Sequence, residues 1–594
     1  MINRTCWGLG LSAASASVLD RLHQAELVQL MPPATPVAAF LAEHWDSSAA
    51  FVAVGACGAI TRLIAPLLKG KHGDPAVVVV DPAGHFAIPL LGGHLAGAEL
   101  LSQRVAALLG GQAVLTGSSS GTGRLALDSF GINWGWRRGG GPWDALMKAA
   151  ASGQQPQILQ EAGLTLWTSL AAAEAAAEGK PDREAPPSPG PPLVISHRLG
   201  NGCRWHPPAL WLGIGCERHT SLSLLERAVD HALETDQLAP EAVAGLASVD
   251  RKGDEPSLLA LAERRRWPLR LFSAAELAPV PVPTPSDAVR REMGTASVAE
   301  AAALLAAGPQ GSLLAAKRIE RSQGSEQGAA TLAIARAGSQ WSPAQGQLHL
   351  IGSGPGRLDL LTPAARHALA ESAIWVGYGL YLDLLEPLRR PDQLRCDGQL
   401  TQERQRCALA LELACQGVTV ALVSSGESGI YGMAGLALKL WLELAESGRP
   451  GFTVHPGVSA LQLAAARAGA PLMHDFCTIS LSDRLTPWAT IEQRLRAAAA
   501  GDFVVALYNP RSLGRNWQLA RAMELLCAGR SGRIPVLLAR QLGRTEERVS
   551  LHVLEELPLE QVDMLSLVLV GNSTTRLVDG RMVTPRGYPG AALN

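Results

Sequence analysis

The sequence lacks the features that mark a zinc ribbon, a nucleic-acid binder or a membrane protein. Its nine cysteines include no Cys-x-x-Cys pair, so we expect no zinc or redox motif, no metal site and reduced thiols. The 52 basic residues balance 53 acidic ones, which leaves no positive excess for nucleic acid. No apolar run reaches the ~18–20 residues of a membrane span. These absences favour a soluble, cytoplasmic enzyme.

The length of 594 residues predicts several domains, because single cores seldom exceed ~250–300 residues. Residues 172–192 are rich in Ala and Glu and then in Pro, as in a tether. Residues 321–346 are rich in Ser, Gln and Gly, with one apolar segment at 330–335 that fits a last strand. We expect the chain on each side of this second break to fold alone. The predicted regions are 1–175, a Pro-rich linker and connection at 176–206, 207–338, and 346–594.

Short apolar runs alternate with Ala- and Leu-rich stretches along the chain. Examples that end in Gly or a polar residue lie at 51–55, 76–81, 209–215 and 503–508. This alternation predicts an α/β protein in which mostly parallel sheets are covered by helices.

A glycine-rich loop at 352–356 follows one such apolar run. Gly354 is followed by Pro355, and the first good helix start is Thr362 as N-cap with Pro363 after it. A dinucleotide site would begin its helix within the glycine motif, where the pyrophosphate binds. Because the helix begins late, the loop is predicted to form an open surface on which a ligand can lie, here called the floor. The late start also argues against a nucleotide-binding dehydrogenase.

This loop, with the segments at 424–432 and 456–460, resembles the tetrapyrrole methyltransferases that use S-adenosylmethionine. The segments at 474–488, 506–512 and 571–576 resemble the precorrin-3B C-17 methyltransferase family of cobalamin synthesis. The resemblance implies a two-lobed α/β/α fold, a homodimer through this half, and cobalt only as part of the substrate. One departure is Glu427, where the family usually has Asp. The cofactor-binding residues it implies are Gly352, Gly354, Pro355, Gly356, Gly426, Glu427, Ile430, Tyr431, Pro456, Gly457, Ser459, Ala460 and Asn509.

The family reaction methylates a carbon and contracts the macrocycle, so we expect an acid or base but no side-chain nucleophile. The candidates in the substrate-like segments are His474, Asp475, Ser482, Asp483 and Tyr508, each of which also fits a loop cap or a solvated polar group. Guanidinium groups suit the acetate and propionate arms of a corrinoid. The candidates for those contacts are Arg484, Arg511, Arg515 and Arg576.

The first half resembles a second family of the same pathway, the cobalt-precorrin-5A hydrolases. The segments that carry this resemblance lie at 55–68, 74–81, 91–98, 213–218, 248–255 and 285–289. His94, in a Gly-Gly-His segment expected to open a helix, fits an acid or base or a helix cap. Asp81 ends a predicted strand, where functional residues of α/β sheets lie. Cys216 fits a nucleophile less well than a small residue in a tight turn.

Together the two resemblances imply a bifunctional enzyme of cobalamin synthesis. The C-terminal half is expected to methylate C-17 of cobalt-precorrin-3 or cobalt-factor III. The N-terminal half is expected to open the lactone of cobalt-precorrin-5A with loss of acetaldehyde. The alternative is a methyltransferase with a non-catalytic corrinoid-binding module.

Overall fold

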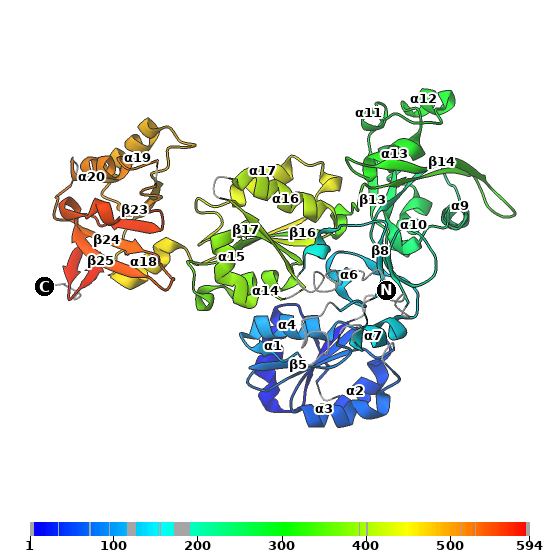
Figure 1. The fold of residues 1–594 in the computed structure, drawn as a ribbon, viewed down its shortest axis with the longest axis horizontal. Helices are drawn as coiled ribbons and strands as arrows, with labels where there is room; N and C mark the ends of the chain where they lie inside the picture. Colours follow the sequence, from blue (N-terminus) through cyan, green and yellow to red (C-terminus); the bar gives the residue numbers. More distant parts are fainter. Residues whose placement is uncertain are drawn as a thin grey trace, which may run out of the picture.

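The computed structural model describes residues 5–33, 35–70, 73–93, 96–115, 126–152, 154, 156–170, 191–390, 392–399, 402–512, 514–528 and 530–589. Figure 1 shows the N-terminal region (blue) and a third region (green) beside the first lobe of the C-terminal half (yellow-green), with the second lobe (orange to red) at the far end. Parallel strand pairs predominate, which confirms the predicted α/β class. Among the described residues, no helix has both the length and the apolar character needed to cross a bilayer.

The N-terminal region is a six-stranded sheet in the order β2-β1-β3-β4-β5-β6. Every residue of β3 and β4 is buried, as expected of strands that helices cover on both faces. The strands are β1 Cys6–Gly10, β2 Gln29–Leu30, β3 Ala50–Val54, β4 Ala76–Val80, β5 Phe86–Leu91 and β6 Gln112–Ala113. The helices are α1 Ala16–Gln24, α2 Val37–His44, α3 Cys57–Ile64 and α4 Ala98–Leu109.

A middle region forms its own four-stranded sheet, in the order β7-β10-β9-β8. Two of these strands, β9 and β10, lie in the range 176–206 that the sequence predicts as linker and connection, so the residues at 193–206 are not a tether. Strands of three or four residues are too short to show the alternation of apolar and polar residues that predicts a strand. The elements are α6 Phe130–Asn133, β7 Arg137–Arg138, α7 Trp143–Ala151, β8 Ile158–Gln160, β9 Leu193–Ile195 and β10 Cys203–His206.

The third region is a five-stranded sheet in the order β13-β12-β11-β15-β14. The apolar segment at 330–335 lies in β15, so the predicted last strand is confirmed. The strands are β11 Leu210–Cys216, β12 Val243–Val249, β13 Leu269–Phe272, β14 Ser312–Arg321 and β15 Ala329–Arg336. The helices are α9 Leu222–Thr235, α10 Pro256–Arg265, α11 Ala274–Leu277, α12 Asp287–Met293 and α13 Val298–Ala306.

The C-terminal half has the two lobes that the sequence predicts. The first lobe is a fully parallel sheet in the order β18-β17-β19-β16-β20. Its elements are β16 Gln347–Gly352, α14 Pro363–Glu371, β17 Ile374–Tyr378, α15 Gly379–Leu385, β18 Leu394–Gly398, α16 Glu403–Cys415, β19 Thr419–Ser424, α17 Ala434–Leu442 and β20 Gly451–His455.

The second lobe is a sheet in the order β22-β23-β26-β24-β25, in which only β22 and β23 pair in parallel. A small sheet, β21-β28-β27, lies at its side. The elements are α18 Ala460–Ala468, β21 Gly469–Ala470, β22 Phe476–Ser480, α19 Trp488–Ala500, β23 Val504–Tyr508, α20 Gln518–Ala528, β24 Pro535–Arg540, β25 Arg548–Val553, β26 Ser566–Val570, β27 Arg576–Val578 and β28 Arg581–Val583.

The middle region and the first lobe share one hydrophobic core. Buried side chains from 127–205 and from 348–440 belong to the same cluster. Gln340, inside the segment predicted as a polar tether, is 2% exposed. Its Oε1 accepts from Trp136 Nε1 at 2.7 Å, and its Nε2 donates to the carbonyl oxygen of Gln416 at 2.7 Å. A segment that is polar in composition therefore supplies hydrogen bonds that join the two halves, and the independent folding of each half stays a prediction.

A second contact joins α4 of the N-terminal region to α14 of the first lobe. Arg104 forms an ion pair with Glu371, which also accepts from His367 at 3.1 Å. Burial raises the pKa of Glu371, but the hydrogen bond from His367 and the charge of Arg104 outweigh it and hold the pKa at about 2. His349 lies beside this carboxylate and hydrogen-bonds His455 at 3.0 Å. Burial, and then the neighbouring His455, lower the pKa of His349 to about 4.

We expect this interface to make the chain less stable in weak acid. Between pH 4 and 6.5 the unfolded chain binds a proton at His349 that the folded chain does not, so stability falls as pH is lowered through this window. The contribution of Glu371 is present above about pH 4.5 and is lost only towards pH 2. Lowering the pH from 7 to 5 should cost about 2 kcal/mol through His349 alone.

Thermal melts of the full-length chain at pH 5, 6 and 7 measure this effect. His349→Gln should flatten the dependence of melting temperature on pH, whereas His85→Gln, at an exposed position of the N-terminal region, should leave it unchanged. Equal slopes for wild type and His349→Gln would contradict the assignment.

Candidate active site

Three glycine-containing loops meet at the carboxyl edge of the first-lobe sheet. They follow the neighbouring strands β16, β19 and β20. Gly354 N donates to Gly426 O at 3.1 Å, and Gly426 N donates back to Gly354 O at 2.8 Å. A Cβ at Gly457 would lie 2.0 Å from Gly426 O and 2.5 Å from Gly352 O, so only glycine fits there. The loops predicted as cofactor-binding are thus brought together on one floor.

The helix after the first loop begins where the sequence predicts. Thr362 is the N-cap of α14, its Oγ1 accepts from Ala365 N at 3.2 Å, and Pro363 is the first helical residue. The same hydroxyl donates to Pro456 O at 3.0 Å, which ties the first loop to the third. A 3-10 turn, Leu358–Leu360, separates the glycines from the helix. No helix N-terminus therefore lies at the glycine loop, unlike in a dinucleotide site.

The loop after β19 turns its side chains in two directions. Glu427 Oε2 accepts from Gly429 N at 2.6 Å, so this carboxylate braces its own loop. Ser428 is buried, and its hydroxyl has no hydrogen-bond partner among the described residues. Tyr431, next to Ile430, reaches the second lobe and donates to Thr478 O at 2.9 Å. The loop therefore both lines the floor and connects the two lobes.

The third loop leads directly into α18. Ser459 caps this helix in a reciprocal arrangement with Gln462, and Ala460 is its first residue. The next residue, Leu461, donates its N–H to Tyr508 Oη at 3.2 Å. The Tyr508 ring lies 5.2 Å from that of Tyr431, between centroids. Burial raises the pKa of Tyr508, so its hydroxyl keeps its proton at neutral pH.

Several predicted residues gather with Tyr508 at the carboxyl ends of β22 and β23. Asn509, at φ +51°, donates to Ser480 Oγ at 3.1 Å. Arg515, 8% exposed, donates to Ser482 Oγ at 3.1 Å, and burial lowers its pKa. Asp483 accepts from Gln518 Nε2 at 2.9 Å. These contacts fix the loop that follows β22.

Two other arginines predicted to bind substrate carboxylates, Arg511 and Arg484, differ in whether their donors are already used. Arg511 donates to Leu559 O at 2.8 Å and so holds a neighbouring loop. Arg484 is exposed, and its guanidinium has no hydrogen bond or ion pair among the described residues. Arg484 is therefore the one of the two with donors free for an anion.

The structure places three predicted residues elsewhere. His474 and Asp475 precede β22, and Val504 N donates to Asp475 O at 3.0 Å at the amino end of β23. Because β22 and β23 pair in parallel, this end lies roughly 13 Å from the Tyr508 end. Arg576 begins β27, beyond the end of β26 that pairs with the start of β23, and donates to Ser573 O at 2.9 Å. None of the three joins the cluster around Tyr508.

Sequence reasoning missed Arg544, in the turn between β24 and β25. This turn reaches the first lobe, where a Cβ at Gly356 would lie 2.7 Å from Gly543 O. Arg544 is half-buried near Tyr378, the last residue of β17, and Tyr381 of α15, and burial lowers its pKa. No hydrogen bond or ion pair of its guanidinium exists among the described residues. The sequence around Arg544 resembles that of any surface turn, so it does not predict that this turn reaches the first lobe.

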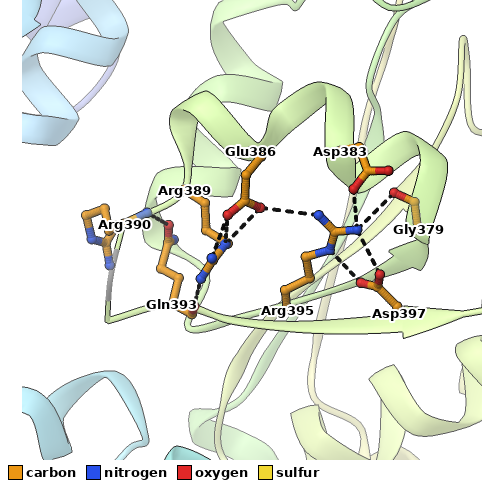
Figure 2. A network of polar contacts seen from close by, with 8 residues as sticks. All are labelled: Gly379, Asp383, Glu386, Arg389, Arg390, Gln393, Arg395 and Asp397. Atoms are coloured by element: carbon orange, nitrogen blue, oxygen red, sulfur yellow. Dashed lines mark hydrogen bonds and ion pairs between the residues drawn. The ribbon is translucent and has the colours of Figure 1, made fainter. Parts of the chain in front are cut away.

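An ion-pair network holds the neighbouring strand ends in place. Figure 2 shows Arg395 of β18 between Asp383, Asp397 and the carbonyl oxygen of Gly379. Its Nη2 donates to Asp383 at 2.6 Å and to Gly379 O at 3.1 Å, and these bonds pin α15 to β18. The hydrogen bond to Asp397 raises the pKa of Arg395, which is therefore always charged. The network fixes Tyr378 and Tyr381 at this edge.

In the N-terminal region the candidates are less available than predicted. Asp81 Oδ1 accepts from Phe86 N at 2.6 Å and its Oδ2 from Ala83 N, so the carboxylate closes the β4–β5 turn. The helix expected at Gly92-Gly93-His94 begins only at Ala98. Its first N–H groups donate to Gly92 O and Gly93 O and are not free for an anion. This corrects the predicted helix opening, and His94 itself lies outside the described residues.

Cys216 ends β11 and is half-buried. Burial raises the pKa of its thiol to about 11, so the thiol is protonated at neutral pH. The protonated thiol is a weak nucleophile, and Cys216 lies in a strand, paired with Ala330, and not in the tight turn that the sequence predicts. In the described part of the chain, no group of three or more His, Cys, Asp or Glu side chains is arranged to hold a metal ion.

Comparison with known proteins covers both halves. The family described as cobalamin synthesis G N-terminal matches residues 39–120, and the cobalamin synthesis G C-terminus matches 210–335. The tetrapyrrole (corrin/porphyrin) methylases match residues 347–558.

Similar proteins align with the C-terminal half. The probable cobalt-factor III C(17)-methyltransferase of Salmonella typhimurium is 48% identical over 243 residues, which are 41% of this chain and 99% of that protein. The precorrin-3B C(17)-methyltransferase of a Sinorhizobium species is 42% identical over 253 residues, which are 42% of this chain and 99% of that protein. A crystal structure of the methyltransferase CobJ is 40% identical, covers 40% of this chain and 100% of its own, and superposes with a TM-score of 0.39.

The alignments with C(17)-methyltransferases span nearly the whole of both relatives, and the two cobalamin synthesis G segments precede this region in the chain. The C-terminal half therefore belongs to the tetrapyrrole methylase family, in its C(17)-methyltransferase branch, and it follows two segments that match the cobalamin synthesis G models.

Proposed function

We propose that this chain is a bifunctional enzyme of corrin-ring synthesis. Its C-terminal half methylates C-17 of cobalt-precorrin-3 or cobalt-factor III and contracts the ring. Its N-terminal half opens the lactone of cobalt-precorrin-5A, and acetaldehyde is lost. The meeting of three glycine loops at one sheet edge, opposite the tyrosines of a second lobe, is the observation that carries the methyltransferase assignment. The two cobalamin synthesis G matches support the hydrolase assignment.

The floor of glycine loops fits S-adenosylmethionine, which supplies an electrophilic methyl group when bound. Glycines that pack backbone on backbone let a ligand approach main-chain N–H and C=O groups closely. The buried Ser428 hydroxyl, which has no partner among the described residues, adds a polar contact. The residues proposed to hold the cofactor are Gly352, Gly354, Pro355, Gly356, Gly426, Ser428, Ile430, Tyr431, Pro456, Gly457, Ser459, Ala460 and Asn509. Glu427 contributes by bracing its loop.

The side chains near the floor orient the substrate and manage protons. Methyl transfer is an in-line displacement, so the main task of the protein is to align the two reactants. Tyr508 keeps its proton at neutral pH, so it can donate a hydrogen bond or a proton during ring contraction but cannot act as a base. Ser482, held by Arg515, is a second polar contact on the same side. No side-chain nucleophile is required.

Arg544 and Arg484 are the proposed anchors for carboxylate arms of the corrinoid. A charge-assisted hydrogen bond contributes ~1.5–3 kcal/mol, so Arg544→Ala should raise the KM for the corrinoid roughly 10- to 100-fold. The KM for S-adenosylmethionine should hardly change. Arg533→Ala is the matched control, because Arg533 is an exposed arginine of the same lobe. An unchanged corrinoid KM in Arg544→Ala would remove Arg544 from the substrate site.

The proposal also includes a homodimer through the methyltransferase half and a cytoplasmic location. The metal of the reaction belongs to the corrinoid substrate and is not a resident cofactor. Sedimentation equilibrium of the purified full-length chain tests the dimer, and a monomer at micromolar concentration would remove that part.

Two assays on the full-length chain test the proposal. Titration calorimetry should detect S-adenosylhomocysteine and show no heat with NAD. Supplied with cobalt-precorrin-5A, the same sample should release acetaldehyde, which a coupled dehydrogenase detects. The positions of Asp81 and Cys216 favour an alternative in which the first half only binds a corrinoid. Corrinoid binding without acetaldehyde release would support that alternative.

A further inference from the structure

An unassigned cluster of charged residues lies in the third region, at the carboxyl ends of β11 and β12. The loop after β11 contributes Cys216, Arg218 and His219, and the loop after β12 contributes Lys252 and Glu255. These strands are parallel neighbours, so both loops lie at the same edge of the sheet. Ligands of open α/β sheets bind at this edge.

Lys252 is buried without a hydrogen bond. Its side chain is 4% exposed, and its one ion-pair contact among the described residues is Glu255 Oε2 at 3.8 Å, beyond hydrogen-bond length. Glu255 is 1% exposed. Its Oε1 accepts from His219 N at 2.9 Å, while its Oε2 has no hydrogen-bond partner. Within the described part of the chain, none of the three donors of the ammonium is used in a hydrogen bond.

The other charged groups of the cluster are already paired. Arg218 Nη1 contacts Asp254 at 2.5 Å and its Nη2 donates to Arg251 O at 2.8 Å. Its distance of 3.7 Å to Glu255 Oε2 is again too long for a hydrogen bond. Of the cations at this edge, Lys252 is therefore the one whose N–H groups are available to bind a ligand.

A nearly buried ion pair that is too long for a hydrogen bond gains little against the hydration that both charges lose. Such a pair fits a site that an anionic ligand completes. We propose that Lys252, positioned by Glu255, binds the carboxylate oxygens of a corrinoid lactone substrate and stabilises the negative charge that forms when the lactone opens.

The chemistry at this site is a hydrolysis, and it rests on the lactone-opening function proposed above. Water adds to the carbonyl carbon, the ring C–O bond breaks, and the products are a carboxylate, an alcohol and one proton. The alcohol then gives up its O–H proton as its C–C bond to the macrocycle breaks, so that acetaldehyde leaves and the macrocycle carbon keeps the electron pair and takes up a proton. The carbonyl oxygen becomes negative during the addition, and the ammonium of Lys252 pairs with it. The same ammonium then holds the product carboxylate, so Lys252 is a catalytic residue and Glu255 a positioning residue.

Lys252→Met tests this proposal in the full-length chain. It keeps the length of the side chain and removes the charge and the donors. We expect acetaldehyde release from cobalt-precorrin-5A to fall ~10²–10³-fold, as for a lost oxyanion donor. Methyl transfer by the C-terminal half of the same sample should be unchanged, which reports that the chain is folded. The melting temperature should fall by a few degrees, because Glu255 is left buried without its ion-pair partner.

Lys317→Met is the matched control in the same region. The ammonium of Lys317 donates to Thr284 O at 2.7 Å, so it is already satisfied. This variant should keep acetaldehyde release. Wild-type acetaldehyde release by Lys252→Met, or an equal loss of release in Lys317→Met, would overturn the proposal.

If the wild type releases no acetaldehyde, the proposed lactone-opening function is removed. Binding of a carboxylate at Lys252 is then tested separately, by titration. Titration with cobyrinic acid, a corrinoid that carries free carboxylates, is the probe. Wild type should bind one equivalent more than Lys252→Met. Equal stoichiometry in the two proteins would overturn the site itself.

Discussion

Replacing Gly457 by alanine should abolish detectable binding of S-adenosylhomocysteine to the full-length chain. The added Cβ would lie 2.0 Å from Gly426 O and 2.5 Å from Gly352 O, distances that backbone atoms cannot accommodate. All three loops of the floor would have to separate, and the loss should exceed 100-fold in Kd, or about 3 kcal/mol. Titration calorimetry at matched protein concentration measures it.

Gly435→Ala is the control for this substitution. Gly435 lies in α17 of the same lobe, and a Cβ there meets no atom within 4 Å. The change should leave binding intact and stabilise the helix by about 1 kcal/mol. Binding retained by Gly457→Ala would show that the ligand is held elsewhere.

Cutting the chain between residues 338 and 346 should leave the N-terminal piece without a cooperative fold and should lower the melting temperature of the C-terminal piece, which aligns with nearly the whole of two relatives. The cut separates Trp136 and its neighbours from the first-lobe strands that complete their core, and apolar side chains of both pieces become exposed. We expect aggregation of the N-terminal piece and a stable complex when both pieces are expressed together. Cooperative circular-dichroism melts of both separate pieces at the melting temperature of the full-length chain would contradict the shared core.

A point variant measures the same interface without a cut. Trp136 is 3% exposed, and its indole N–H bonds Gln340 across the junction. Trp136→Ala should cost about 3–5 kcal/mol of stability, as for other buried aromatic truncations. Trp517→Ala, at a position 49% exposed in the second lobe, should cost far less.

Features encoded by a few neighbouring residues could be predicted from the sequence. Thr362 and Pro363 carry the start of α14 in their own conformational preferences, and the apolar segment at 330–335 is β15. The glycine loops were predictable as a ligand floor because together they resemble the cofactor loops of one family, and the first of them follows an apolar strand. Their mutual contacts were not, since the spacing of Gly426 and Gly457 along the chain does not report a distance in space.

Features that depend on tertiary packing could not be predicted. The strands β9 and β10 are three and four residues long and are defined by their partners, not by a periodic pattern. Gln340 looks like a linker residue until its hydrogen bonds across the junction are seen. His474 and Tyr508 belong to equally suggestive motifs, yet the direction of β22 and β23 places them at opposite edges of the sheet. Arg544 and Lys252 stand out only through burial without a hydrogen-bond partner.

The most direct test of the bifunctional assignment uses one purified full-length sample and two substrates. With S-adenosylmethionine carrying a labelled methyl group and cobalt-factor III, we expect one labelled methyl per corrinoid, at C-17. With cobalt-precorrin-5A, the same sample should release one acetaldehyde per corrinoid without S-adenosylmethionine. Failure to label cobalt-factor III while S-adenosylhomocysteine binds, or labelling at a carbon other than C-17, would contradict the account.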